Sequence, residues 1–219
     1  MHVVCSLPQL DPMFRDLVSH STSCDDPFTM ELSEVLPLVR SHDAKNTDTI
    51  HAMQPSGFVF HESRCGSTLA ANSLAAMDPA KHRVYSESSP SITALKACGK
   101  HGAQCPSGRA AQLIQDVLYL MGRTNQVQEE RLFFKIQSIG TKSIDIMRQA
   151  FPSVPWVFIY RDPVQVMMSQ VAQGVERANC VRQMKDLDPK SKGLIKENGK
   201  SLNSLEPEER CALHLVSFF

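Results

Sequence analysis

The chain has 219 residues and a formal net charge of zero, from 23 basic and 23 acidic side chains. This balance excludes a global field that would attract nucleic acid or an anionic membrane, so any anion site must be local. The length suits one domain. Because the sequence has no long apolar run, we expect neither a membrane span nor a signal peptide. Seven cysteines without a framework spacing favour a reducing compartment, so we expect a cytoplasmic protein.

Residues 1–55 carry the weakest pattern in the chain. Short helical patterns over 12–19 and 30–40 alternate with polar loops such as 41–49. We expect a helical N-terminal extension that packs on the core, with partial disorder as the alternative. The main domain is then expected over residues 56–219.

The stretch 57–74 reads GFVFHESRCGSTLAANSL and is the centre of the predicted site. An apolar run, Phe58–Phe60, predicts a strand, and a small-residue helix follows from Leu69 to Met77. The first N–H groups of a helix have no internal partner and lie at the positive end of its dipole, so a glycine turn before them can bind an anion. The turn also carries residues suited to phosphate or sulfate: Gly66 allows close backbone approach, Ser67 and Thr68 offer hydroxyl donors, and Arg64 offers a charged planar guanidinium group. The alternative is an ordinary capped helix.

This turn departs from the phosphate-binding pattern of nucleoside triphosphatases. When the turn is aligned on Gly66, Ser67 stands where those enzymes place a lysine, and His61 stands at the first glycine. We therefore expect no ATP or GTP hydrolysis.

Strand and helix patterns alternate along the rest of the chain, which predicts βαβ units, a mainly parallel sheet and a three-layer α/β/α architecture. Ligands of such sheets bind at the carboxyl ends of the strands. The expected strands are 83–87, 131–137 and 156–160, the last an apolar run typical of a strand covered on both faces. One expected helix has Pro90 in its first turn, is capped by Ser89 and runs towards Cys98. Another runs from Thr141 or Lys142 to Phe151, and the remaining expected helices are 109–123, 163–184 and 207–219. Residues 186–206 are expected to form a loop or a lid.

A second candidate anion site lies in YRDPVQVMMSQ, residues 160–170. Arg161 leaves the strand just before a helix, and Ser169 lies about two turns into that helix. Both side chains can contact one phosphate if the loop folds back. A local salt bridge between Arg161 and Asp162 is the alternative.

These two motifs, R-C-G-S-T-L after the first strand and Y-R-D-P-V-x-V-x-x-S after a later one, resemble the sulfotransferase superfamily. The resemblance covers residues 57 to about 173. It implies a P-loop-like fold and 3′-phosphoadenosine 5′-phosphosulfate (PAPS) as the sulfuryl donor, with no metal required. The donor-binding residues that it implies are Arg64, Cys65, Gly66, Ser67, Thr68, Leu69, Arg161 and Ser169.

The implied reaction transfers a sulfuryl group to a hydroxyl or amine of a small-molecule or carbohydrate acceptor. Loop N–H groups and Arg64 are expected to stabilise the charge that grows on the leaving phosphate. Many cytosolic members carry Lys-Thr-His before the second motif, where this chain has Lys135-Ile136-Gln137. Carbohydrate-type and bacterial members often use a glutamate after the second strand, where this chain has Glu87. The resemblance therefore implies Glu87 as the general base and Lys135 as a stabiliser of the transferring group, with a capping carboxylate and a salt-bridge partner as the alternatives.

Two other functions remain open from the sequence. A nucleotide or small-molecule kinase with a P-loop fold is the first, and a non-catalytic nucleotide-binding relative with a shortened C-terminus is the second. The second arises because the family's further basic loop is missing, and lysines 190, 192, 196 and 200 replace it poorly.

His61 and Glu62 are candidates for substrate contact, Cys65 for a reactive thiol, and Cys98, His101 and Cys105 are weak metal ligands because a fourth partner is lacking.

Overall fold

The computed structural model describes residues 13, 29–99, 102–172, 174–182 and 189–216. These residues form two compact units. The first comprises the chain up to His61 together with 66–158, and the second comprises 62–65 together with 159–219.

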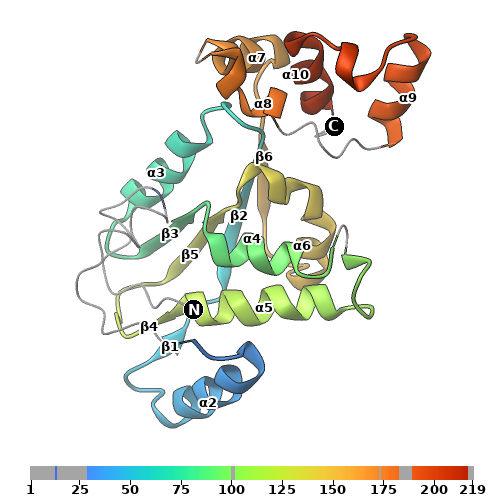
Figure 1. The fold of residues 1–219 in the computed structure, drawn as a ribbon. Coiled ribbons are helices and arrows are strands. Elements are labelled where there is room, and N and C mark those ends of the chain that lie inside the picture. The colour runs from blue at the N-terminus through green and yellow to red at the C-terminus, as the bar shows by residue number, and fades with distance from the viewer. Residues whose placement is uncertain (1–12, 14–28, 100–101, 173, 183–188, 217–219) are drawn as a thin grey trace. The chain divides into compact units, whose positions relative to one another are not determined.

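The first unit is built on a parallel sheet (Figure 1). Its strands, β2 (Pro55–His61), β3 (His82–Ser86), β5 (Arg131–Lys135) and β6 (Trp156–Ile159), lie in the order β3-β5-β2-β6. β5 pairs in parallel with both β2 and β3, and its last residue, Lys135, lies opposite Val59 and Ser86. The predicted α/β class with a parallel sheet is therefore confirmed.

Alternation along the strands places their large apolar side chains in one core. Phe58 and Phe60 of β2, and Leu132 and Phe134 of β5, are at most 3% exposed. Helices α4 (Ser89–Lys96), α5 (Arg109–Gly122) and α6 (Ile144–Ala150) add apolar residues to the same cluster, and Figure 1 shows them together beside the sheet. Helix α3 (Ser67–Met77) instead packs against β3.

The described N-terminal part of the first unit contributes one helix and one strand of a short antiparallel pairing. Helix α2 (Leu32–Lys45) replaces the expected 30–40, and the expected 12–19 helix lies outside the described residues. β1 (His51–Ala52) pairs antiparallel with β4 (Arg123–Thr124), which the sequence did not predict. Asp43 of α2 binds the Arg123 guanidinium at 2.7 and 2.8 Å, so α2 is joined to the end of α5 by an ion pair.

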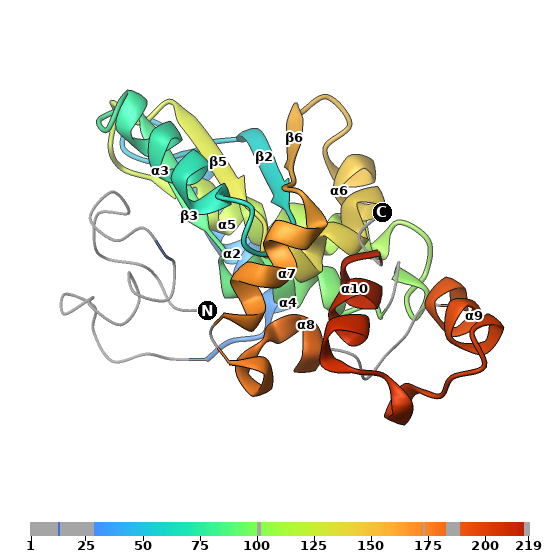
Figure 2. The ribbon, with the colours of Figure 1, turned by 90° about the horizontal axis from the view of Figure 1, so that it is seen from above.

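Beyond β6, the second unit is helical. It contains α7 (Pro163–Val171), α8 (Asn179–Arg182), α9 (Pro189–Glu197), α10 (Pro207–Val216) and the 3₁₀ turns η3 (Val175–Arg177) and η4 (Leu202–Ser204) (Figure 2). A disulfide joins Cys180 to Cys211, so α8 is linked covalently to α10.

Two expectations for the second unit are wrong. The 163–184 helix ends at Val171, because Gly174 takes a positive φ of 98° and starts a 3₁₀ turn. The expected 186–206 loop contains α9 and η4. Ile195 and Leu205 are buried together there, and this packing outweighs the polar composition of the segment.

The expected burial of the 156–160 strand is also wrong. β6 stands last in the sheet order among the described strands, and Trp156 and Val157 are 44% and 55% exposed. An apolar run indicates a strand but not its neighbours, so the sequence could not separate a central strand from an edge strand.

Smaller corrections concern where helices begin. Ser88, not Ser89, is the N-cap residue of α4, and its hydroxyl contacts Ser91 Oγ at 2.7 Å. A 3₁₀ segment, η2 (Ser138–Ser143), precedes α6, so the α-helix expected from Thr141 or Lys142 begins at Ile144. Helix ends differ by a residue or two because terminal turns tighten readily.

The cysteines do not support the compartment inferred from the sequence. Cys98 is bonded to Cys105, and a second disulfide joins Cys180 to Cys211. Disulfides of this kind persist in oxidising environments, so cysteine usage no longer favours a cytoplasmic location. In the part of the chain that the structure describes, no helix is long and apolar enough to span a membrane.

A buried ion pair closes the end of the sheet where β3 and β5 begin. The Arg83 guanidinium binds both carboxylate oxygens of Glu129, and these side chains are only 10% and 3% exposed. Arg83 also donates to the Arg123 carbonyl at 2.9 Å. Removing one member of such a pair leaves an uncompensated buried charge.

We therefore expect Glu129→Ala to lower the free energy of unfolding by about 3–5 kcal/mol. The neighbouring Glu130 provides a matched control, since its ion pair with Lys81 is about half exposed. Glu130→Ala should leave the stability nearly unchanged. Urea denaturation of both variants measures the difference, and equal losses would contradict a stabilising role for the buried pair.

Candidate functional site

In the first unit, polar side chains gather at the carboxyl ends of neighbouring strands. His61 ends β2, Lys135 ends β5, and Glu87 follows β3 directly. The Lys135 ammonium forms an ion pair with Glu87 Oε1, and His61 Nε2 lies 3.5 Å from the same oxygen. Lys135 and His61 are buried, while the Glu87 side chain is 23% exposed. The carboxylate is thus the member of the cluster that faces solvent.

Glu87 has an unusual backbone as well as an unusual environment. Its φ of 57° lies in the left-handed region, which a residue other than glycine adopts at a cost of about 1–3 kcal/mol. Its N–H donates to the Lys135 carbonyl at 2.8 Å, which holds this conformation. The His61 ring, whose Nε2 lies 3.5 Å from Oε1, and the Lys135 ion pair together lower the pKa of Glu87 to about 2, despite the opposing effect of burial. Glu87 is therefore ionised throughout the neutral range.

The predicted anion turn has the expected local form. Gly66 takes a φ of 89°, as a glycine can, and is the N-cap residue of α3. Among the described residues no side chain caps this helix, so its first N–H groups are not used by a capping side chain. Ser67 is buried, whereas Thr68 and Leu69 are exposed. Cys65 donates its thiol to the Glu62 carbonyl at 3.1 Å.

In the second unit, Arg64 contacts the helix of the second motif. Its Nε donates to Ser169 Oγ at 3.1 Å, although the residues are 105 positions apart in the sequence. Arg64 also takes a positive φ of 63°, so strain accompanies this contact too. The structure therefore joins residues of the first and second sequence motifs.

Arg161 is held beside the same helix by a different residue. Its Nε donates to Gln165 Oε1 at 2.9 Å. Asp162 is the N-cap of α7 and accepts the Gln165 N–H at 3.1 Å, and no ion pair links it to Arg161 in the described structure. The alternative of a local salt bridge is therefore not observed. Gln165 and Ser169 occupy neighbouring turns of one helix face, so both guanidinium groups are bound along that face.

Sequence reasoning found most of these residues but not all their contacts. Arg64, Arg161 and Ser169 were predicted, yet Ser169 contacts Arg64 rather than Arg161. Gln165 was missed, although its position one turn before Ser169 was a usable signal. His61 and Glu62 were expected only as possible substrate contacts. Glu62 is 0% exposed and accepts the Arg161 N–H at 2.6 Å, so its observed role is internal.

The weaker candidates of the sequence are not supported as ligands. Cys98 and Cys105 are bonded to each other, and His101 lies outside the described residues. No group of three or more His, Cys, Asp or Glu residues able to hold a metal occurs in the described structure. Three of the four C-terminal lysines, Lys190, Lys192 and Lys196, are exposed residues of α9, and Lys200 pairs with Glu209.

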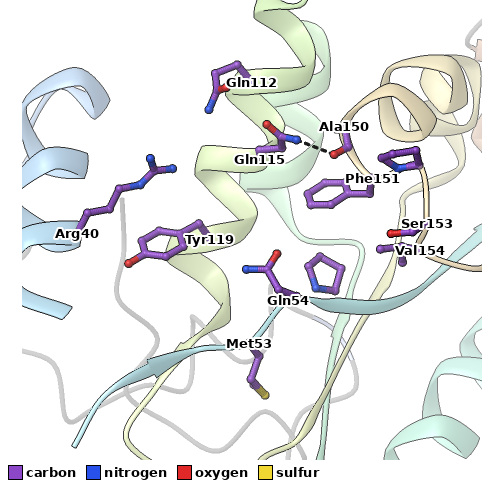
Figure 3. Close-up of a pocket in the computed structure, with 12 residues that line it drawn as sticks. Arg40, Met53, Gln54, Gln112, Gln115, Tyr119, Ala150, Phe151, Ser153 and Val154 are labelled. Atoms are coloured by element: carbon purple, nitrogen blue, oxygen red, sulfur yellow. Dashed lines mark hydrogen bonds between the residues drawn. The ribbon is translucent and has the colours of Figure 1, made fainter. Parts of the chain in front are cut away.

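A separate pocket of about 380 Å³ lies at the opposite, amino-terminal end of β2 (Figure 3). Its cation, Arg40, already binds Asp116 at 2.9 Å, and Gln115 donates to the Ala150 carbonyl at 2.6 Å. The pocket therefore offers no uncompensated charge for an anion. Its lining residues are Arg40, Met53, Gln54, Pro55, Gln112, Gln115, Tyr119, Ala150, Phe151, Pro152, Ser153 and Val154.

These features define an α/β protein with a parallel sheet and polar groups at the carboxyl ends of its strands. No family model, no curated protein and no solved structure matches the chain.

The lowered pKa of Glu87 makes a prediction for stability. The pKa is about 2 in the folded state and near its ordinary 4.5 in the unfolded state, so its contribution is present above pH 4.5 and is lost as the pH falls towards 2. We expect Glu87→Gln to flatten the pH dependence of unfolding free energy in this window. Urea titrations at several pH values test this, with Glu208→Gln, a change at an exposed residue of α10, as the control. A slope that Glu87→Gln leaves unaltered would refute the ion pair.

Proposed function

We propose that the chain is a PAPS-dependent sulfotransferase with a three-layer, P-loop-like fold. One observation carries the proposal: Arg64 and Arg161 are exposed, and each is bound through Nε to a neutral oxygen on one face of α7. Neither forms an ion pair among the described residues. A dianionic nucleotide would therefore meet oriented guanidinium groups without displacing a carboxylate.

The order of the strands in the first unit supports a ligand at the carboxyl ends of those strands. The connection from β2 leads to β3 on one side, whereas β6 lies on the other side of β2. A reversal of this kind makes the carboxyl end of β2 the topological switch point, where open parallel sheets bind ligands. The anion turn with Gly66, Ser67 and Thr68 follows β2 directly.

In the proposed reaction, the acceptor oxygen or nitrogen forms a bond to sulfur while the bond from sulfur to the phosphate oxygen breaks. The electron pair of that bond leaves with adenosine 3′,5′-bisphosphate. Arg64 and the N–H groups of the turn stabilise the negative charge that develops on the leaving phosphate. Arg161 and Ser169 bind the 3′-phosphate, as the resemblance to the superfamily implies.

Glu87 and Lys135 have complementary tasks in this proposal. Glu87 is ionised, as a general base must be, but a pKa of about 2 makes it a weak one. A donor sulfonate that attracts the Lys135 ammonium would loosen the ion pair and raise the pKa of Glu87. The base would then gain strength only when the donor is bound, and the acceptor proton would go to Glu87.

Titration calorimetry with adenosine 3′,5′-bisphosphate, ATP and AMP tests the donor class. We expect the bisphosphate to bind at least about tenfold more tightly than AMP, because one more phosphate meets a guanidinium group. Arg161→Ala should remove most of that preference, and Arg148→Gln, a change at an exposed arginine of α6, should not. Preference for ATP would favour a kinase, and equal weak binding of all three a non-catalytic relative.

Glu87→Gln tests the proposed base. We expect sulfuryl transfer from radiolabelled PAPS to a panel of phenols, sugars and amines to fall by about 10²-fold or more, because the proton acceptor is lost. Bisphosphate affinity should stay within about threefold, since Glu87 contacts Lys135 and not the nucleotide in this proposal. Unchanged turnover in Glu87→Gln would rule out the role, and Glu208→Gln serves as the control.

A further inference from the structure

Glu62 is a buried acid that neither the anion turn nor the reaction uses. Its exposed fraction is 0%, the lowest among the acidic residues that the structure describes as buried. A carboxylate removed from water is costly unless hydrogen bonds compensate it. The hydrogen bonds of Glu62 therefore indicate which part of the chain its burial stabilises.

The contacts of Glu62 hold the main chain at the start of the second motif. Its Oε1 accepts the Arg161 N–H at 2.6 Å, and its own N–H donates to the Ile159 carbonyl at 3.2 Å. These bonds flank Tyr160 on both sides, so the chain that leads into Arg161 is fixed at both ends. A hydrogen bond to a charged acceptor is among the stronger ones in proteins.

Glu62 also stands close to Arg64 in the sequence, within the same four-residue segment, 62–65, of the second unit. The segment is held in addition by the Cys65 thiol, which donates to the Glu62 carbonyl. One residue thus connects the backbones that carry both guanidinium groups.

We propose that Glu62 is a positioning residue that sets Arg161 at the spacing required by a ligand with phosphates at both ends. The proposal rests on the function proposed above. Glu62 does not touch the nucleotide and acts through Arg161. Its contribution to binding exists only while the Arg161 side chain is present.

A double-mutant cycle on bisphosphate affinity tests this mode of action. Glu62→Met keeps the size of the side chain and removes the acceptor, and exchanging a buried charge for an apolar group need not reduce stability. We expect Glu62→Met to weaken binding of adenosine 3′,5′-bisphosphate at least about tenfold in the otherwise unchanged chain, and less than about twofold in an Arg161→Ala background. An equal loss in both backgrounds would overturn the proposal, as would affinity unchanged by Glu62→Met alone.

Glu62→Gln is the conservative control, because its amide oxygen can still accept the Arg161 N–H. We expect it to restore affinity to within about threefold of the natural chain. Melting temperatures of both variants show whether a loss of affinity reflects unfolding. A Gln variant as weak as the Met variant, at equal stability, would also overturn the proposal.

The anchoring can be measured without any nucleotide. Hydrogen exchange at the Arg161 amide should be at least about tenfold faster in Glu62→Met than in Glu62→Gln. Equal exchange rates would refute the anchoring whatever the ligand is. Failure of the natural chain to prefer the bisphosphate, with exchange altered as expected, would instead reject the sulfotransferase function and leave the anchoring in place.

Discussion

The ion pair between Lys135 and Glu87 is the interaction on which the candidate site of the first unit depends. Lys135 is 1% exposed, and an ammonium at that depth requires a nearby negative charge. The pairing of β5 with both β2 and β3 provides it, because the shared register brings the strand ends to the same level. The positive φ of Glu87 is then the local strain that aligns its carboxylate with this ammonium and with His61.

The second unit differs from the first in that its guanidinium groups at the candidate site are exposed. Arg64 and Arg161 keep their charge exposed and use neutral side-chain oxygens of α7 to hold their orientation. A neutral partner orients a guanidinium group without cancelling its charge, so the attraction for an anion is retained. Ion pairs elsewhere in the chain, such as Arg83 with Glu129, serve stability, and their guanidinium groups are not available for a ligand. This distinction between ion-paired cations and cations without an ion pair among the described residues is what supports the proposal of an anion site on the α7 face.

Oriented but uncompensated charge also fits the proposed chemistry. Sulfuryl transfer requires little covalent participation by the protein and depends on fixed donors at the leaving phosphate. The weak basicity of Glu87 is compatible with such a reaction only if ligand binding changes its surroundings, which is the coupling that the proposal assigns to Lys135. Glu62 acts on the backbone in the proposal above, where its buried carboxylate accepts the Arg161 N–H.

The amino-acid sequence by itself determined the α/β class, the strand that precedes the anion turn, and the polar residues at the strand ends, since these follow from local periodicity and glycine placement. Only the tertiary structure decided that β6 lies at an edge, that α9 forms within a polar segment, and that Ser169 contacts Arg64. Each of these depends on contacts between residues far apart in the chain, such as the packing of Ile195 with Leu205, and local propensity carries no record of such contacts. The hydrogen bonds of Glu62 and Gln165 could not be predicted for the same reason, because the fold decides which residues lie within hydrogen-bond distance.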